Sequence, residues 1–101
     1  MQQSITAMDF SGLAGWRLRF GAAQLDICQQ GAQILSYFAD IAQPPLIWLS
    51  DCAEYVKGQG VRGGVPVCWP WFGALEYNPA AVQKMITADA PFHGLARTVD
   101  W

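Results

Sequence analysis

Apolar and polar residues alternate along three short stretches in the first part of the chain, which is the pattern of strands that bury one face. In residues 16–20 the apolar side chains fall on one side. Residues 23–29 and 32–38 repeat the alternation after glycine-containing turns. Strands spaced about ten residues apart predict an antiparallel sandwich or barrel, so the expected fold class is all-β.

Other segments give weaker or different patterns. Residues 5–15 show no clear alternation, and their glycines indicate a turn. Residues 46–49 follow two prolines as a short apolar run, which predicts a buried strand. Asn78 and Pro79 suit the cap and first position of a helix, and the apolar spacing after them predicts one short helix over 79–87.

The most distinctive stretch, residues 62–73, combines a two-glycine turn with aromatic residues and prolines. Proline has no backbone N–H, so Pro66 and Pro70 exclude a regular central strand. We therefore expect an edge or an irregular extended segment that lines a cleft. Strict alternation would place four apolar side chains together on one side: Val65, Val67, Trp69 and Trp71.

The composition indicates less polar surface than a typical soluble domain has. The 101 residues are 52% hydrophobic and 14% charged, whereas about 25% charged is usual. A self-associating oligomer or one part of a larger domain would explain this, and we expect 1–101 to be a single incomplete domain. The net charge of -2 argues against nucleic acid and membrane partners.

The cysteines Cys28, Cys52 and Cys68 form an odd number with no spacing typical of a metal site. Apolar neighbours predict that Cys28 and Cys68 are buried free thiols. The N-terminus shows no secretory signal, and these features together predict a reducing, cytoplasmic location. With no phosphate-cradling loop or metal-ligand set in view, neither a cofactor nor a metal is expected.

The polar residues that look placed for chemistry are Arg62, His93 and Arg97. Two glycines follow Arg62 and permit backbone angles closed to other residues, and a guanidinium can hold a phosphate or carboxylate with two hydrogen bonds. His93 precedes Gly94, where backbone can approach a ligand closely. A core or capping histidine and surface arginines are the ordinary alternatives, and spacing does not decide between them.

Residues 62–73, RGGVPVCWPWFG, and 93–97, HGLAR, resemble motifs of the hexose-6-phosphate mutarotases. These form the glucose-6-phosphate 1-epimerase branch of the aldose 1-epimerase, or galactose mutarotase-like, superfamily. Residues 31–36 and 46–50 are similar to early strands of that family. The resemblance implies the N-terminal portion of a β-supersandwich. It also implies interconversion of the α and β anomers of aldohexose 6-phosphates by acid–base ring opening, without a cofactor.

By motif, the resemblance implies that Arg62 and Arg97 bind the hexose 6-phosphate, notably its phosphate, and that His93 faces it. The family's catalytic histidine and glutamate would lie beyond Trp101, so no catalytic residue is assigned and no significant activity is expected of this chain alone. Whether the chain is itself an enzyme therefore stays open. The alternatives are a non-catalytic sugar-phosphate-binding module and a fragment that self-associates through exposed strand edges.

Overall fold

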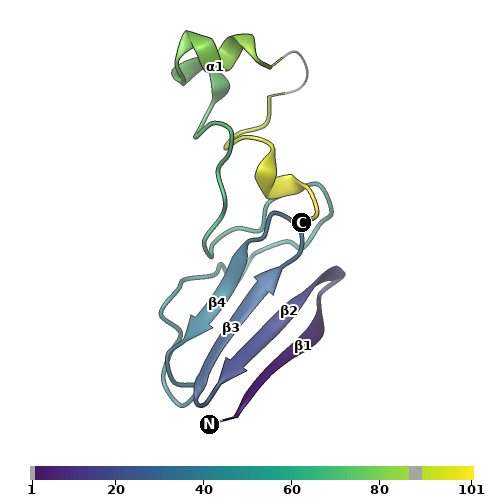
Figure 1. Ribbon diagram of the computed structural model, residues 1–101, viewed down its shortest axis with the longest axis vertical. Coiled ribbons are helices and arrows are strands. Elements are labelled where there is room, and N and C mark those ends of the chain that lie inside the picture. Colours follow the sequence, from purple (N-terminus) through teal and green to yellow (C-terminus); the bar gives the residue numbers. More distant parts are fainter. Residues whose placement is uncertain (1, 87–89) are drawn as a thin grey trace.

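The computed structural model describes residues 2–86 and 90–101, and its main element is a four-stranded antiparallel sheet (Figure 1). The strands pair in sequence order, each with its neighbour in the chain. The predicted all-β class is confirmed, and the predicted strands correspond to the last three of the four. The strands are β1 (Gln3–Phe10), β2 (Leu13–Phe20), β3 (Ala23–Cys28) and β4 (Ile34–Phe38).

The sequence pattern of residues 5–15 does not predict β1, which pairs with β2 alone and leaves nearly all of its side chains exposed. Neither face of β1 is uniformly apolar, because Ile5 shares its face with Gln3 and Asp9. The chain turns into β2 at Ser11 and Gly12, whose φ angles are 55° and 105°. Asp9 stabilises this turn by accepting a hydrogen bond from the Gly12 N–H at 2.6 Å. Gly15, expected in a turn, lies inside β2.

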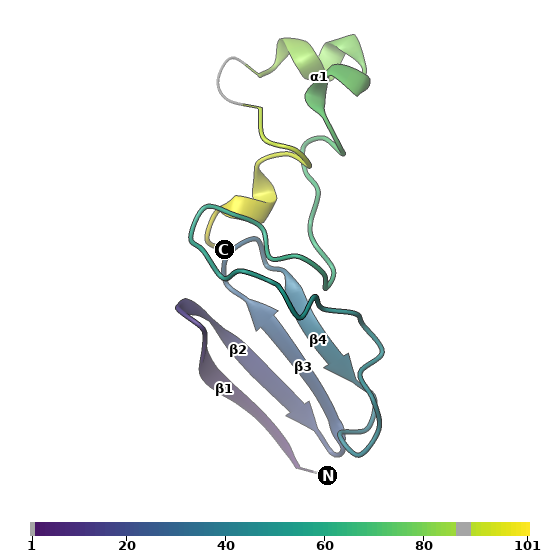
Figure 2. The ribbon, with the colours of Figure 1, turned by 180° about the vertical axis from the view of Figure 1, so that it is seen from behind.

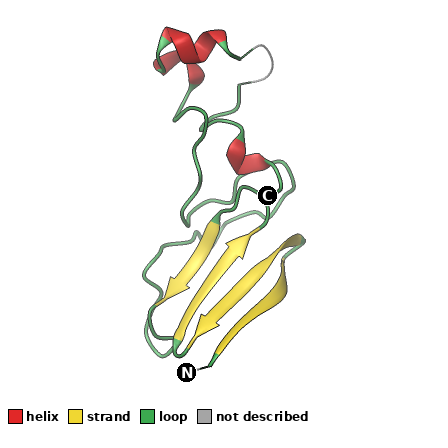
Figure 3. Cartoon of the chain, viewed as in Figure 1, coloured by secondary structure: helices red, strands yellow, loops and turns green. Residues whose placement is uncertain are grey.

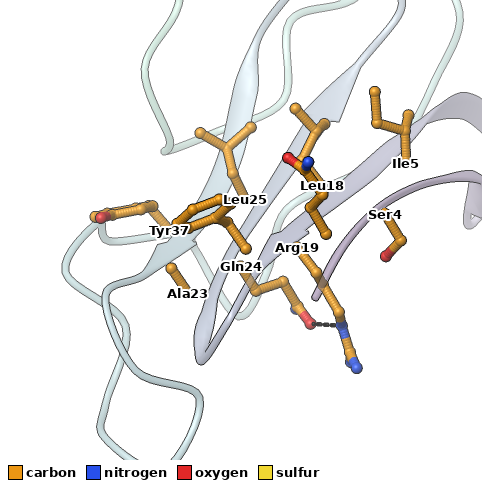
Figure 4. A pocket seen from close by; sticks show the side chains of 10 residues that line it. Ser4, Ile5, Leu18, Arg19, Ala23, Gln24, Leu25 and Tyr37 are labelled. Atoms are coloured by element: carbon orange, nitrogen blue, oxygen red, sulfur yellow. Dashed lines mark hydrogen bonds between the residues drawn. The ribbon is translucent and has the colours of Figure 1, made fainter. Parts of the chain in front are cut away.

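One face of the sheet is apolar and largely exposed. The register places Ile5 opposite Leu18, Leu18 opposite Leu25, and Leu25 opposite Tyr37, so these side chains form a row across all four strands (Figure 4). Ile5 is 72% exposed and Phe20 is 56% exposed. We call the following residues the apolar face: Ile5, Trp16, Leu18, Phe20, Leu25, Ile27 and Tyr37.

The opposite face carries the core, which sits at one end of the sheet. Its buried members come from the strands and from the long connection that follows β4. That connection passes over this end of the sheet, as the view from behind shows (Figure 2). The buried cluster consists of Leu13, Cys28, Leu35 and Val61, with Phe10, Leu49, Ala53 and Tyr55 packed against it.

Residues 46–49 do not form the predicted buried strand. Leu46 and Trp48 are 68% and 65% exposed, and Leu49 makes only an isolated bridge to Gly63. The Trp48 carbonyl accepts a hydrogen bond from the Gly64 N–H at 2.7 Å. This segment therefore pairs with a tight glycine turn, which offers no continuous ladder of backbone partners along which a strand could form.

Residues 62–73 are irregular and extended, as predicted, but their side chains do not alternate as expected. Trp71 is 2% exposed, whereas Trp69 is 67% exposed. The Trp71 indole N–H donates to the Pro91 carbonyl at 3.0 Å, which holds this ring under the following segment. The Trp69 carbonyl accepts from the N–H groups of Leu95 and Ala96. Pairing with distant backbone thus overrides local periodicity here.

The predicted helix is confirmed in a shorter form, as α1 (Ala80–Lys84), preceded by η1 (Leu75–Tyr77); η2 (Ala96–Thr98) lies further on (Figure 3). The predicted cap is wrong, because Pro79 is the N-cap and makes no side-chain cap bond. The Asn78 amide instead donates backward to the carbonyls of Phe72 and Ala74, both at 2.9 Å. Thr87, the predicted helix end, lies outside the described residues.

The molecule is elongated, with α1 projecting far from the sheet (Figure 1). Its radius of gyration is 15.6 Å, whereas about 13 Å is typical of a compact domain of this length. The helices within residues 2–86 and 90–101 are too short to cross a bilayer. The elongated shape and the exposed apolar face show that the sheet is covered on only part of its surface.

Candidate functional site

Arg62 lies in a loop whose backbone is held from two directions. Its carbonyl accepts a hydrogen bond from the Ser50 N–H at 3.1 Å. The two neighbouring residues, Val61 and Gly63, are held by Gln33, whose Nε2 donates to both of their carbonyls at 2.7 Å. The Arg62 side chain is exposed and makes no hydrogen bond with the described residues, so its guanidinium is available to an anion.

His93 adopts a left-handed backbone conformation with φ 68°. Its Nδ1 accepts a hydrogen bond from the Gly73 N–H at 2.9 Å, which places the proton of the neutral imidazole on Nε2. The rings of Phe72 and Phe92 lie beside the imidazole, with centroids at 4.7 and 4.0 Å. The half-buried ring therefore offers one donor, Nε2–H, from a fixed orientation.

The Arg97 guanidinium lies between the loop of Arg62 and the segment of His93. A methyl group added to Gly60 would overlap it, which shows how closely it approaches this loop. Its Nη1 donates to the Phe92 carbonyl at 3.5 Å, a long hydrogen bond. Its Nε is buried and has no hydrogen-bond partner among the described residues. An unpaired buried donor is costly, and this atom is enclosed by the chain, so only the outer nitrogens of the guanidinium can meet a ligand.

Arg97 thus contacts the surroundings of both other predicted site residues, while no hydrogen bond or ring contact of the described residues joins Arg62 to His93. The group offers donors without a carboxylate partner, since the ion pair found in the described part of the chain is Arg17–Asp26. Such donors suit an anion that accepts several hydrogen bonds, such as phosphate. No three His, Cys, Asp or Glu side chains gather as a metal site within 2–86 and 90–101.

Comparison with models of known protein families gives no match. An Escherichia coli (strain K12) protein provisionally named glucose-6-phosphate 1-epimerase is 43% identical over 72 residues, which are 71% of this chain and 21% of that protein. The crystal structure of a protein from Salmonella typhimurium, provisionally described as a mutarotase, matches with a TM-score of 0.74 at 31% identity, over 96% of this chain and 29% of that one. The crystal structure of HI1317 matches all of this chain with a TM-score of 0.73 at 27% identity, over 36% of its own length.

The resemblance to hexose-6-phosphate mutarotases is confirmed. The chain spans about a fifth of the length of the Escherichia coli relative. Its sheet and short helix match one part of the larger solved structures, which confirms the expected supersandwich class for this part.

The turn between β3 and β4 anchors both arginine segments, which the sequence pattern does not predict. Gln30 is 4% exposed; its amide donates to the Gln59 carbonyl and accepts from the Gly58 N–H, both at 2.7 Å. The Gly31 N–H donates to the Val99 carbonyl at 2.7 Å, which docks the segment of Arg97 on this turn. Glutamines within an apolar, glycine-containing turn were the available signal, because buried amides require partners.

An apolar hollow lies elsewhere, on the apolar face (Figure 4). Leu18, Leu25 and Tyr37 contribute to its lining, whereas the hydrogen bond from Arg19 to Gln24 at 3.0 Å lies on the other side of the sheet (Figure 4). None of the predicted site residues lines it. The hollow is therefore separate from Arg62, His93 and Arg97.

Proposed function

We propose that this chain supplies part of the substrate-binding surface of a hexose-6-phosphate mutarotase, which interconverts the α and β anomers of an aldohexose 6-phosphate. The names of the relatives and the shared fold support this class of activity. In this proposal residues 1–101 form one incomplete domain, because the chain spans about a fifth of the Escherichia coli relative and its sheet leaves one apolar face exposed.

Each proposed binding residue has a distinct role. Arg62 and Arg97 hold the phosphate, whose oxygens accept the two-pronged hydrogen bonds that a guanidinium donates. His93 directs Nε2–H toward a sugar oxygen, because the Gly73 N–H already occupies Nδ1. The main support is the Arg62 guanidinium, an exposed charged donor that makes no hydrogen bond with the described residues.

The proposal assigns binding, and not proton transfer, to these residues. Ring opening needs one group to deprotonate the anomeric hydroxyl and another to protonate the ring oxygen. Glu54 and Glu76 are exposed, and neither forms an ion pair with Arg62 or Arg97 within the described chain. We expect this chain alone to leave the anomerisation of glucose 6-phosphate, followed by polarimetry, at the buffer rate. Clear acceleration would contradict this assignment.

Titration of the chain with glucose 6-phosphate tests the binding role. NMR spectra are expected to show saturable shifts at His93 and at the side chains of both arginines, with weaker binding of glucose, which lacks the phosphate. Arg62→Ala and Arg97→Ala should each weaken binding about tenfold or more, the loss expected for one charge-assisted hydrogen bond. Arg19→Ala is the matched control, because this arginine bonds Gln24 on the sheet. Equal binding by all variants would refute the proposal.

The exposed apolar face favours a second candidate function, self-association of two copies through this surface. Monomeric proteins rarely leave a large contiguous apolar patch in water. The edge strand β1 also presents unpaired backbone groups to a second copy. Light scattering should then give a mass that rises with protein concentration, and Leu18→Glu should abolish the rise. A constant monomer mass would exclude this candidate.

A further inference from the structure

Gln33 is a polar side chain buried beside the loop of Arg62. It is 2% exposed and among the largest side chains that are fully buried. Its Nε2 donates to the carbonyls of Val61 and Gly63, both at 2.7 Å, and its Oε1 accepts from the Val61 N–H at 3.3 Å. These are the two residues on either side of Arg62. One amide therefore holds the loop backbone immediately before and after the arginine.

The chemistry of this contact requires a primary amide. Nε2 has two N–H donors and each meets one carbonyl, while Oε1 supplies the acceptor for an N–H. A carboxylate could accept from Val61 but could not donate to the carbonyls, and an apolar side chain could do neither. Because the site is buried, water does not replace the missing partners, and each backbone group left unpaired is costly.

Backbone contacts of Gly63 and Gly64 also hold this loop, whereas the Arg62 side chain remains exposed. The Gly64 N–H donates to the Trp48 carbonyl at 2.7 Å. A methyl group on Gly63 would press against the backbone of Leu49, so this loop packs tightly on its neighbour. The backbone is thus fixed on both sides of Arg62 while the guanidinium remains exposed.

We propose that Gln33 is a positioning residue for phosphate binding, which acts by fixing the backbone from which Arg62 reaches the anion. This inference rests on the binding role proposed above. A side chain on a fixed backbone loses less conformational freedom on binding, so preorganisation increases affinity without any new contact. Gln33 itself touches no substrate.

Gln33→Met tests this, with Gln24→Met as the matched control. Both remove a buried amide, but the Gln24 amide lies in β3, bonds Arg19 and is remote from the loop. Glucose 6-phosphate titration should show about tenfold weaker binding for Gln33→Met, comparable to loss of one charge-assisted hydrogen bond. Gln24→Met should bind as the unsubstituted chain does. Unchanged affinity in folded Gln33→Met would overturn the inference.

A double-mutant cycle separates positioning from a general loss of structure. If Gln33 acts through Arg62, adding Gln33→Met to Arg62→Ala should cause no further loss of affinity, because interacting residues are not additive. Two additive losses would overturn the inference. If the unsubstituted chain itself fails to bind glucose 6-phosphate, the proposed function is refuted. Additive losses, by contrast, would refute only the role of Gln33.

Hydrogen exchange of the unsubstituted chain provides a test that needs no folded variant. The Val61 N–H, which donates to Gln33 Oε1, should exchange as slowly as the amides between β2 and β3. An exchange rate typical of an unprotected loop would show that the amide does not hold this backbone, and would also overturn the inference.

Discussion

His93 and Gly73 are joined by two reciprocal hydrogen bonds. The Gly73 N–H donates to Nδ1 of His93 at 2.9 Å, and the His93 N–H donates to the Gly73 carbonyl, also at 2.9 Å. This pair ties the end of residues 62–73 to the segment that begins at Pro91. The two sequence motifs are therefore linked directly in space, and the imidazole orientation depends on that link.

Substitution of His93 should separate backbone strain from ligand binding. Asparagine tolerates the left-handed conformation, and its side-chain oxygen is an acceptor, so His93→Asn should keep nearly normal stability. His93→Val should lose about 1–2 kcal/mol more, because a β-branched side chain is strained at φ 68°. Urea unfolding compares the two, and equal stability would contradict the strain argument. Both variants lack the imidazole donor and should bind glucose 6-phosphate more weakly than the unsubstituted chain.

Gly60→Ala should displace the Arg97 guanidinium while leaving the fold intact. The three atoms nearest to the added methyl group all belong to the Arg97 guanidinium, at the flexible end of this side chain. Since Gly60 is not among the residues with positive φ, alanine fits its backbone. We expect a change in free energy of unfolding below about 1 kcal/mol. Binding of glucose 6-phosphate should weaken as much as in Arg97→Ala, and unaltered binding would show that this position of Arg97 is irrelevant.

The ion pair on the sheet should contribute to stability rather than binding. Arg17 Nε and Nη2 donate to the two carboxylate oxygens of Asp26 at 2.8 and 3.0 Å, and this hydrogen bonding raises the pKa of Arg17. Arg17→Met should lower the free energy of unfolding by about 1–3 kcal/mol, because it removes the ion-pair partner of the half-buried Asp26 carboxylate. Arg19→Met, which removes a bond to neutral Gln24, is the control and should cost less.

The pH dependence of the Arg17 contribution follows from the direction of its shift. A raised pKa means that the stabilisation is complete below the ordinary pKa of an arginine and is lost only as the pH rises above that value. The difference in unfolding free energy between Arg17→Met and the unsubstituted chain should therefore stay constant from neutral to mildly alkaline pH. A decrease over that range, measured by urea unfolding, would contradict this.

Cys28 should make the folded state sensitive to alkaline pH. Burial raises the pKa of the Cys28 thiol from its ordinary value of 9.0, so the unfolded thiol ionises first. The stabilisation is complete below 9.0 and is lost as pH rises through the higher folded value. Unfolding free energy should therefore decline above pH 9.0, and Cys28→Ala should remove that part of the decline. An equal decline in the variant would point to another group.

The difference in burial between the cysteines should also determine the order in which their thiols react. Cys52 is exposed and should react first with iodoacetamide under native conditions, while Cys28 should react only on unfolding. Mass spectrometry of digested, labelled protein measures this. Rapid native labelling of Cys28 would contradict its placement in the core. The prediction that Cys28 is buried and free is confirmed, whereas Cys68 is only partly buried.

Local patterns predicted elements where apolar and polar residues alternate, although the apolar side of β2 lies on the exposed face of the sheet. They gave the strands that became β2, β3 and β4, because polar and apolar residues there face different surroundings. They failed for β1, which is exposed on both faces, and for residues 46–49, which pair with a turn. Asn78 failed as a cap because its amide finds two carbonyls behind it.

The candidate site was predicted only in part. The sequence singled out Arg62, His93 and Arg97 from glycine neighbours and a family resemblance, and their binding role stays a prediction. It did not reveal that Arg97 lies over Gly60, since that contact joins segments far apart in the chain. It also did not reveal Gln33, because a glutamine in a strand looks the same whether solvent or a buried loop meets its amide.

The sequence by itself determined the strand periodicity, the glycine turns and the motifs shared with mutarotases, because each depends on neighbouring residues. Only the tertiary structure decided which polar groups meet. The amide of Gln33 reaches Val61 and Gly63, and the imidazole of His93 reaches Gly73. Buried donors and acceptors must be paired, and folding selects their partners from anywhere in the chain. These long-range pairings produce no periodic pattern in the sequence.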